Sequence, residues 1–278
     1  MAKLNQYQKT LHSAIPQRYR VQVLERSFGI LETLANAEEE LSPVDLAGRL
    51  GLHKSTIHRL LVVLEGQRFV RKTLQGKYGL GMKLIEMGSR AVEQLDLGAH
   101  ALPFLQKLVD ETGETAHICV LSGVEMMSIA NVPGRWTLRT PSTVGRRTQT
   151  YCTSVGKACI AFLPADDLDN LIARLEFTKN THRTITTASD LKAELARVRR
   201  RGFAVDDEEV EEGLRCVGAP IRDYSGHVVA ALSIAGPVFR IQKGQIPALS
   251  RAVMKAADSL SIDLGFVKPQ LPGKRQVS

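Results

Sequence analysis

Apolar residues recur at helical spacing in three segments of the first 65 residues, and this spacing predicts three helices. The segments are residues 21–35, 43–50 and 54–65. The apolar residues that set the spacing are Leu24, Phe28, Leu31, Ala35, Leu46, Ala47, Leu50, Ile57, Leu60, Leu61 and Leu64. Each predicted helix therefore has one face to bury and one face for solvent.

The ends of the second helix are marked by residues that suit helix termini. Ser42 can cap the helix, Pro43 suits its first position, and Asp45 can complete a capping box with Ser42. Gly51 supplies the left-handed residue that ends the helix. A short capped helix, one glycine turn and a further helix are the parts of a helix-turn-helix.

The solvent face of the third helix carries hydroxyl, imidazole and cationic groups, which can meet base edges or phosphates in the major groove. Residues 69–80 follow as two strand-like runs around Gln75-Gly76, which predicts a β-hairpin, or wing. A small helical domain with solvated charges is the alternative. The candidate DNA-binding residues are Lys54, Ser55, Thr56, His58 and Arg59 on the helix, and Arg71, Lys72 and Lys77 on the hairpin.

The rest of the chain mixes helical and strand patterns. Residues 82–97 predict one linker helix, and a helix ending before Gly113 follows. Ser189 is expected to cap a helix that runs to Arg201. The remaining predictions are strands at 115–121, 124–132, 216–222 and 227–235 and a helix at 247–264. The fold class is α+β: an N-terminal winged helix-turn-helix plus a C-terminal domain with a largely antiparallel sheet.

Charge is concentrated at the N-terminal end. Residues 1–90 hold 14 Lys and Arg against 8 Asp and Glu, whereas the rest of the chain holds 23 against 21. Within residues 53–83 there are seven basic residues and one acidic residue. Such a patch attracts a polyanion, because neutralised phosphates release their condensed counterions.

Composition also limits the class of protein. No apolar run reaches the roughly 18 residues of a membrane span, and the start lacks the apolar stretch of a signal peptide, so we expect a cytoplasmic protein with no membrane partner. The four cysteines show neither zinc-ligand spacing nor a disulfide framework. We expect free thiols, no bound metal and no cofactor.

Three separated motifs resemble one family, the IclR-type bacterial transcriptional regulators. The first is LSPVDLAGRLGLHKSTIHRLLVVLEGQRFVRKTLQGKYGLGMKLIEMG, which looks like the family's DNA-binding domain. The other two resemble its effector domain: YCTSVGKACIAFLP, and GFAVDDEEVEEGLRCVGAPIRD followed by VVAALSIAGP. The resemblance covers residues 20–266 and implies a GAF-like effector-binding fold.

The resemblance also implies which residues hold an effector, a small organic or aromatic acid. Backbone amides of Ser154 and Val155 would receive its carboxylate, since a helix N-terminus favours anions. Ala235 stands where many relatives have a second serine. Because one hydroxyl is lost there, the resemblance gives less support to a compact keto acid as the effector. Trp136 matches a position at the rim. The other residues carried over are Thr137, Thr140, Thr148, Asp206, Leu214, Cys216 and Ser233.

Three other sequence features have both a functional and a structural interpretation. Residues 154–157 match S-x-x-K of serine hydrolases, but the partner motifs are missing, and we expect Lys157 to pair at the surface. Control of the regulator by oxidation of Cys216 or Cys152 is an alternative that the sequence leaves open. The acidic run at 206–212 lacks the spacing of a calcium loop, which favours a solvated turn.

The sequence therefore predicts a regulator, not an enzyme, that binds a pseudo-palindromic double-stranded operator as a dimer or a dimer of dimers. Repression modulated by a small acid is the expected mode, and a sensor acting through protein partners is the alternative. The expected organisation is a basic tail at 1–19, the winged helix-turn-helix at 20–81, the linker helix at 82–97, the effector domain at 98–266 and a tail at 267–278.

Overall fold

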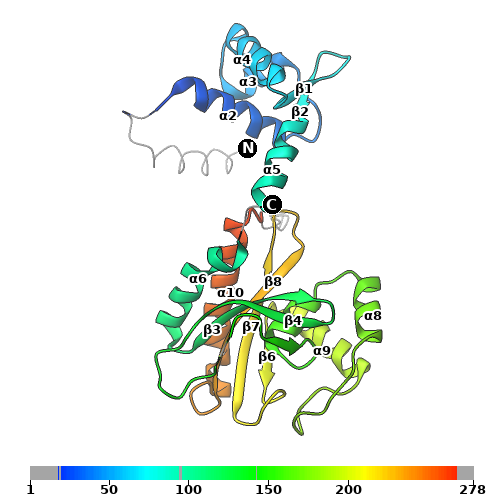
Figure 1. Ribbon diagram of the computed structural model, residues 1–278. Helices are drawn as coiled ribbons and strands as arrows, with labels where there is room; N and C mark the ends of the chain where they lie inside the picture. The colour runs from blue at the N-terminus through cyan, green and yellow to red at the C-terminus, as the bar shows by residue number, and fades with distance from the viewer. Residues whose placement is uncertain (1–17, 19, 94–95, 142, 268–278) are drawn as a thin grey trace, which may run out of the picture. The chain divides into compact units, whose positions relative to one another are not determined.

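The computed structural model describes residues 18, 20–93, 96–141 and 143–267 (Figure 1). The tails predicted at 1–19 and 267–278 fall almost entirely outside these residues. The chain divides into two compact units, Met1–Leu95 and Asp96–Ser278. Each unit has its own hydrophobic core, as separate domains do.

The first unit is a winged helix-turn-helix built around one small core. Ile30, Leu46, Ile57 and Leu61 are fully buried at its centre, one or two from each of its first three helices. The elements are α2 (Gln22–Ala35), α3 (Pro43–Leu50), α4 (Lys54–Gly66), the antiparallel pair β1 (Val70–Lys72) and β2 (Tyr78–Leu80), and α5 (Met82–Glu93).

The ends of α3 form as the sequence predicts. The Ser42 hydroxyl accepts from the Asp45 amide at 3.2 Å, and the Asp45 carboxylate accepts from the Ser42 amide at 3.0 Å. Gly51 ends the helix with φ of 64°, in the left-handed region that glycine adopts without strain. Of the linker helix expected at 82–97, the structure describes Met82–Glu93 as helical; residues 94–95 lie outside the described residues, and Leu97 already belongs to the next helix.

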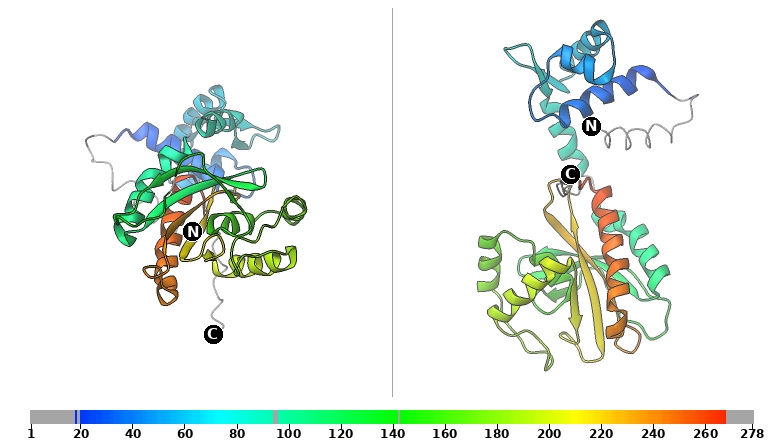
Figure 2. Two further views of the ribbon diagram at one scale, coloured as in Figure 1. Left: turned by 60° about the horizontal axis from the view of Figure 1, so that its bottom comes forward. Right: turned by 180° about the vertical axis from the view of Figure 1, so that it is seen from behind.

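The second unit is a six-stranded antiparallel sheet with helices on both faces (Figures 1 and 2). The strands are β3 (Thr115–Ser122), β4 (Glu125–Val132), β5 (Arg147–Gln149), β6 (Ala204–Asp207), β7 (Leu214–Arg222) and β8 (Val228–Pro237). Their order in the sheet is β5-β4-β3-β8-β7-β6, so the first strand of the domain, β3, pairs with the last, β8.

Two helical layers bury the two faces of this sheet. Helices α6 (Leu97–Thr112) and α10 (Ile246–Asp263) cover one face and share a core with the inward residues of β3, β7 and β8. A single 3-10 turn, η2 (Lys243–Gln245), leads into α10. The other face is covered by α7 (Ser154–Ile160), α8 (Ala165–Ala173) and α9 (Ala188–Arg201), which enclose a second core. Because helices cover both faces, β8 is buried along most of its length.

Some predicted boundaries were wrong. Helix α9 is capped by the hydroxyl of Thr187, which accepts from the Asp190 amide at 3.1 Å, and Ser189 lies inside the first turn. The spacing of Thr187 and Asp190 is itself a capping signal that the sequence prediction passed over. Within the described residues, no helix has the length and apolarity that a membrane crossing requires.

Helix α7 packs closely on the backbone before it, and this contact requires a glycine. A Cβ atom on Gly156 would lie 2.3 Å from the carbonyl oxygen of Thr150. On the sheet side, a Cβ on Gly218 of β7 would lie 3.0 Å from the backbone of Ser154. The two glycines therefore set how near the start of α7 comes to the strands.

We expect Gly156→Ala to lower the free energy of unfolding of the second unit by about 3 kcal/mol, because backbone atoms would have to move to admit the methyl group. Urea denaturation followed by circular dichroism measures this. Gly244→Ala is the matched control, since a Cβ at Gly244 meets nothing within 4 Å. Equal stabilities of the two variants would contradict the close-packing argument.

Candidate functional site

The exposed face of α4 carries the side chains that the sequence assigned to DNA. Lys54, Ser55, His58 and Arg59 are exposed and Thr56 is partly buried. The opposite face of α4 is held in the core by Ile57, Leu60, Leu61 and Leu64. The polar face is thus a rigid set of donors and acceptors on a fixed helix, as major-groove recognition needs.

His53 caps α4 and was not singled out from the sequence. Its Nδ1 accepts from the Ser55 amide at 3.3 Å and lies 2.8 Å from the Ser55 hydroxyl. An imidazole is an uncommon cap, so the usual Ser, Thr, Asp and Asn signals gave no hint of it. His53 also holds the Ser55 side chain in place at the start of the helix.

The hairpin places its basic residues outward. Arg71, Lys72 and Lys77 are all exposed. Arg71 contacts the Glu40 carboxylate at 2.7 Å, and the Lys72 ammonium lies 5.9 Å from the centre of the Tyr78 ring. The exposed Glu40 pair is a weak one, so Arg71 is available to a phosphate at little cost.

The second unit contains a cavity of about 80 Å³ between the sheet and the start of α7. One water needs roughly 10–15 Å³, so this space suits a small organic molecule. The lining comes from all six strands and the neighbouring segments: His117, Cys119, Ser128, Thr140, Pro141, Arg146, Thr148, Thr153, Ser154, Val155, Asp206, Val210, Leu214, Cys216 and Ala235.

The structure brings together seven of the nine residues that the sequence assigned to an effector. These seven line the cavity: Thr140, Thr148, Ser154, Val155, Asp206, Leu214 and Cys216. Ser233 is fully buried beneath it, with its hydroxyl 3.2 Å from His117 Nε2. Thr137 is exposed and does not line the cavity.

The first turn of α7 faces this cavity. Thr153 caps the helix by accepting from the Gly156 amide at 3.1 Å. The amides of Ser154 and Val155 belong to the first turn, where the helix offers no acceptor of its own. Both residues are almost completely buried, so a ligand that accepts from these amides would be shielded from water.

A segment between β4 and β5 closes one side of the cavity. The Thr115 hydroxyl donates to the Thr140 carbonyl at 3.1 Å, and Arg240 donates to the Leu138 carbonyl at 2.8 Å. Arg240 also pairs with the buried Glu114 carboxylate. Trp136, on the same segment, stacks against Arg135 and Arg240 at 4.9 and 5.4 Å, so its side chain is held away from the cavity.

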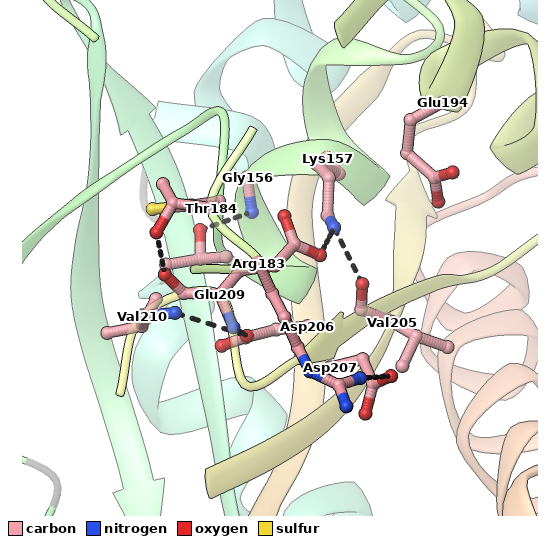
Figure 3. A network of polar contacts seen from close by, with 12 residues as sticks. Gly156, Lys157, Arg183, Thr184, Glu194, Val205, Asp206, Asp207, Glu209 and Val210 are labelled. Atoms are coloured by element: carbon pink, nitrogen blue, oxygen red, sulfur yellow. Dashed lines mark hydrogen bonds and ion pairs between the residues drawn. The ribbon is translucent and has the colours of Figure 1, made fainter. Parts of the chain in front are cut away.

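A buried group of charges lies beneath α7 (Figure 3). Lys157 is fully buried, and its ammonium donates to the Val205 carbonyl at 2.7 Å and to the Glu209 carboxylate. The expectation that Lys157 pairs at the surface was wrong. Its partners come from β6 and the following turn, far along the sequence, and no local pattern announces them. The ammonium is occupied by these acceptors, which does not favour a role as the base for Ser154.

Asp206 is the second buried carboxylate of this group. It accepts from the amides of Glu209 and Val210 at 2.8 and 3.4 Å, and it lines the cavity beside Cys216. Burial raises the pKa of Asp206 to about 6 against the opposing effect of Lys157. Burial likewise raises the pKa of Glu209 to about 7. Two carboxylates thus share one ammonium, and a proton joins them as the pH falls below 7.

Two further carboxylates of the acidic run at 206–212, those of Asp207 and Glu208, are paired with arginines. The Asp207 carboxylate contacts Arg183 and Arg215, each at 2.7 Å. Across the described ranges, no group of three or more His, Cys, Asp and Glu has an arrangement that holds a metal ion. The expected solvated turn was wrong for Asp206 and Glu209, which are buried.

The four cysteines are all buried and unpaired with one another. Burial raises the pKa of Cys119, Cys152 and Cys159 to about 12, and it raises the pKa of Cys216 well above its ordinary value. Thiols with such pKa values stay protonated at neutral pH and are poor nucleophiles. This disfavours control by thiol oxidation.

Comparison with known proteins gives concordant matches for both units. The family descriptions "IclR helix-turn-helix domain" and "Bacterial transcriptional regulator IclR C-terminal" match residues 23–74 and 89–262. The chain is 33% identical to the HTH-type transcriptional regulator XynR of Escherichia coli (strain K12) over 247 residues, which are 88% of this chain and 98% of XynR.

Two further comparisons agree with these matches. The Transcriptional repressor IclR of Escherichia coli (strain K12) is 33% identical over 256 residues, covering 91% of this chain and 93% of that protein. The crystal structure of the Agobacterium tumefaciens repressor BlcR superposes with a TM-score of 0.76 at 27% identity, covering 89% of this chain and 99% of BlcR.

We expect Lys157→Met to lower the free energy of unfolding by about 3–5 kcal/mol at pH 8, because two buried carboxylates lose their only buried ammonium. At pH 5.5 the loss should be smaller. When the pKa of a carboxyl group is higher in the folded protein than in the unfolded one, protonation of that group stabilises the fold. This stabilisation is complete below the unfolded pKa and is lost as the pH rises through the folded pKa. Urea titrations at both pH values measure the difference.

Lys192→Met is the control for this experiment. Its ammonium contacts Asp169 at 2.6 Å, but both side chains are more than half exposed. Removing such a pair should change stability by less than about 1 kcal/mol at either pH. A loss for Lys157→Met that is the same at pH 5.5 and pH 8 would contradict the shared-charge arrangement.

Proposed function

The chain belongs to the IclR family of bacterial transcriptional regulators, and we propose that it is a repressor whose hold on DNA changes when a small organic or aromatic acid occupies the cavity. The protein is a DNA-binding transcriptional regulator with a winged helix-turn-helix and a C-terminal ligand-binding domain. Repression is supported by the relatives that are named repressors. The observation that carries the proposal is the cavity under the first turn of α7.

The DNA contact is proposed at the exposed face of α4 and at the hairpin. The groups that meet base edges are those on the first turns of α4, namely Ser55, Thr56, His58 and Arg59. Lys54 and the hairpin residues Arg71, Lys72 and Lys77 serve the phosphates, which fix register and add affinity without reading sequence.

Self-association through the first unit would match a pseudo-palindromic operator. Apolar side chains are exposed on two of its helices: Leu24 and Phe28 on α2, and Met82 and Ile85 on α5, each at least half exposed. An apolar surface of this kind is commonly covered by a partner. We propose a second copy of the chain as that partner, in a dimer or a dimer of dimers.

The acid is proposed to place its carboxylate at the Ser154 and Val155 amides. The exposed Arg146 guanidinium at the cavity lining adds positive charge that attracts an anion. Asp206, with its pKa raised to about 6, can take a proton and donate to the same carboxylate. The apolar side chains of Val155, Val210 and Leu214 would surround the body of the ligand.

Control of DNA binding then follows from differential affinity. A ligand shifts an equilibrium between two states of a protein only if it binds one state better than the other. By linkage, the operator must change the affinity for the acid by the same factor as the acid changes the affinity for the operator.

We expect Arg59→Ala to weaken specific DNA binding by about 1–3 kcal/mol while leaving binding to unrelated DNA almost unchanged, because a base contact carries sequence information. We expect Lys77→Ala to weaken binding to both DNAs and to reduce the salt dependence by about one counterion. Gel shifts on the intergenic DNA upstream of the protein's own gene, in rising salt, measure both effects.

Arg174→Ala is the matched control, since it removes the same exposed charge from the second unit. It should bind as the unaltered protein does. Unchanged discrimination by Arg59→Ala between the upstream DNA and competitor would contradict the assignment of α4 as the reading element.

A further inference from the structure

Two buried polar atoms, His117 Nδ1 and the Ser128 hydroxyl oxygen, lie at one end of the cavity. Among the described residues, His117 Nδ1 makes no hydrogen bond, and the Ser128 hydroxyl has only the Cys119 thiol, a weak partner, beside it. Both residues line the cavity. Ser128 is 6% exposed. A polar atom removed from water without a partner is costly, so such atoms call for a group that fills the space beside them.

The two residues lie on adjacent strands and belong to one end of the cavity. His117 is on β3 and Ser128 is on β4, where it pairs in register with Cys119, another lining residue. Asp206 and Cys216 line the other end, on β6 and β7. Apolar Val155 and Leu214 also contribute to the lining. A bound molecule that satisfies both ends therefore has two separated polar groups and an apolar body.

The imidazole of His117 is neutral under ordinary conditions. Burial, and then the charge of Arg146, lower its pKa to about 4. Nε2 lies 3.2 Å from the Ser233 hydroxyl, which can donate or accept, so Nδ1 is a donor in one tautomer and an acceptor in the other. The Ser128 hydroxyl can also do both. A ligand hydroxyl satisfies either arrangement, whereas a keto oxygen only accepts and satisfies one.

We propose that His117 and Ser128 form a second polar subsite that binds a hydroxyl group of the effector, so that the effector is a hydroxylated acid. This rests on the proposed binding of an acid in the same cavity. Ala235 is consistent with this assignment, because its methyl group leaves the floor of the cavity without a further hydroxyl, and the polar recognition falls to β3 and β4.

The experiment is calorimetric titration of the full-length protein with matched pairs of acids that differ only by one hydroxyl. The probes are para-hydroxybenzoate and benzoate, meta-hydroxyphenylacetate and phenylacetate, and lactate and propionate. We expect the hydroxylated member of at least one pair to bind about tenfold more tightly, the gain from one well-made hydrogen bond.

Two variants test whether His117 and Ser128 cause the preference for the hydroxylated acid. Ser128→Ala and His117→Phe should each bring the two members of the pair to nearly equal affinity, while the affinity for the deoxy acid stays within about twofold. Ser122→Ala is the control: it lies on β3 outside the cavity, where its hydroxyl accepts from Arg147 at 3.3 Å, and it should keep the preference. Circular dichroism and the melting temperature of each variant confirm folding.

A second readout follows the imidazole directly. In unaltered protein labelled with ¹⁵N at histidine, the hydroxylated acid should move the His117 Nδ1 resonance and the deoxy acid should not. This measurement needs no variant, so it does not depend on whether a variant folds. Pairs that bind equally well, or a preference that survives Ser128→Ala, would overturn the hydroxyl subsite and leave the acid site standing. Binding of no acid in the panel would overturn both.

Discussion

The buried ammonium of Lys157 links α7 to β6 and to the turn that follows it, and the position of this helix in the effector domain depends on that link. It ties the helix to the Val205 carbonyl and the Glu209 carboxylate, two groups about 50 residues further along the chain. The close contacts at Gly156 and Gly218 allow the helix to reach that position. Because the same helix presents the Ser154 and Val155 amides, the ion pair also fixes one wall of the cavity.

Local signals in the sequence were sufficient for the parts of the fold that local chemistry decides. Ser42, Asp45 and Gly51 define α3, and Gly76, with φ of 76°, turns the hairpin. The four central strands of the sheet could be read from their alternation and their turns. Strands β5 and β6 could not, because three or four residues hold no clear period and are strands only by pairing with β4 and β7.

The site was predictable where a motif marks it and not where it depends on pairing across the sheet. The sequence motifs led to Ser154, Asp206 and Cys216, which meet around the cavity. His117 and Ser128 gave no signal, since a polar residue on a strand looks the same whether it faces solvent or a buried space. The prediction that Lys157 pairs at the surface was wrong for a related reason: a lysine is assumed to be exposed unless its partners are known.

Trp136 gives the domain a built-in optical reporter. It is the only tryptophan in the chain, and it lies on the segment whose Thr140 and Pro141 line the cavity. Its ring centre is 4.9 Å from the Arg135 guanidinium and 5.4 Å from that of Arg240. The emission of an indole depends on the charges and the water around it. Any displacement of that segment relative to Arg240 would therefore change the colour or the yield of the protein's own fluorescence, without a dye or a label.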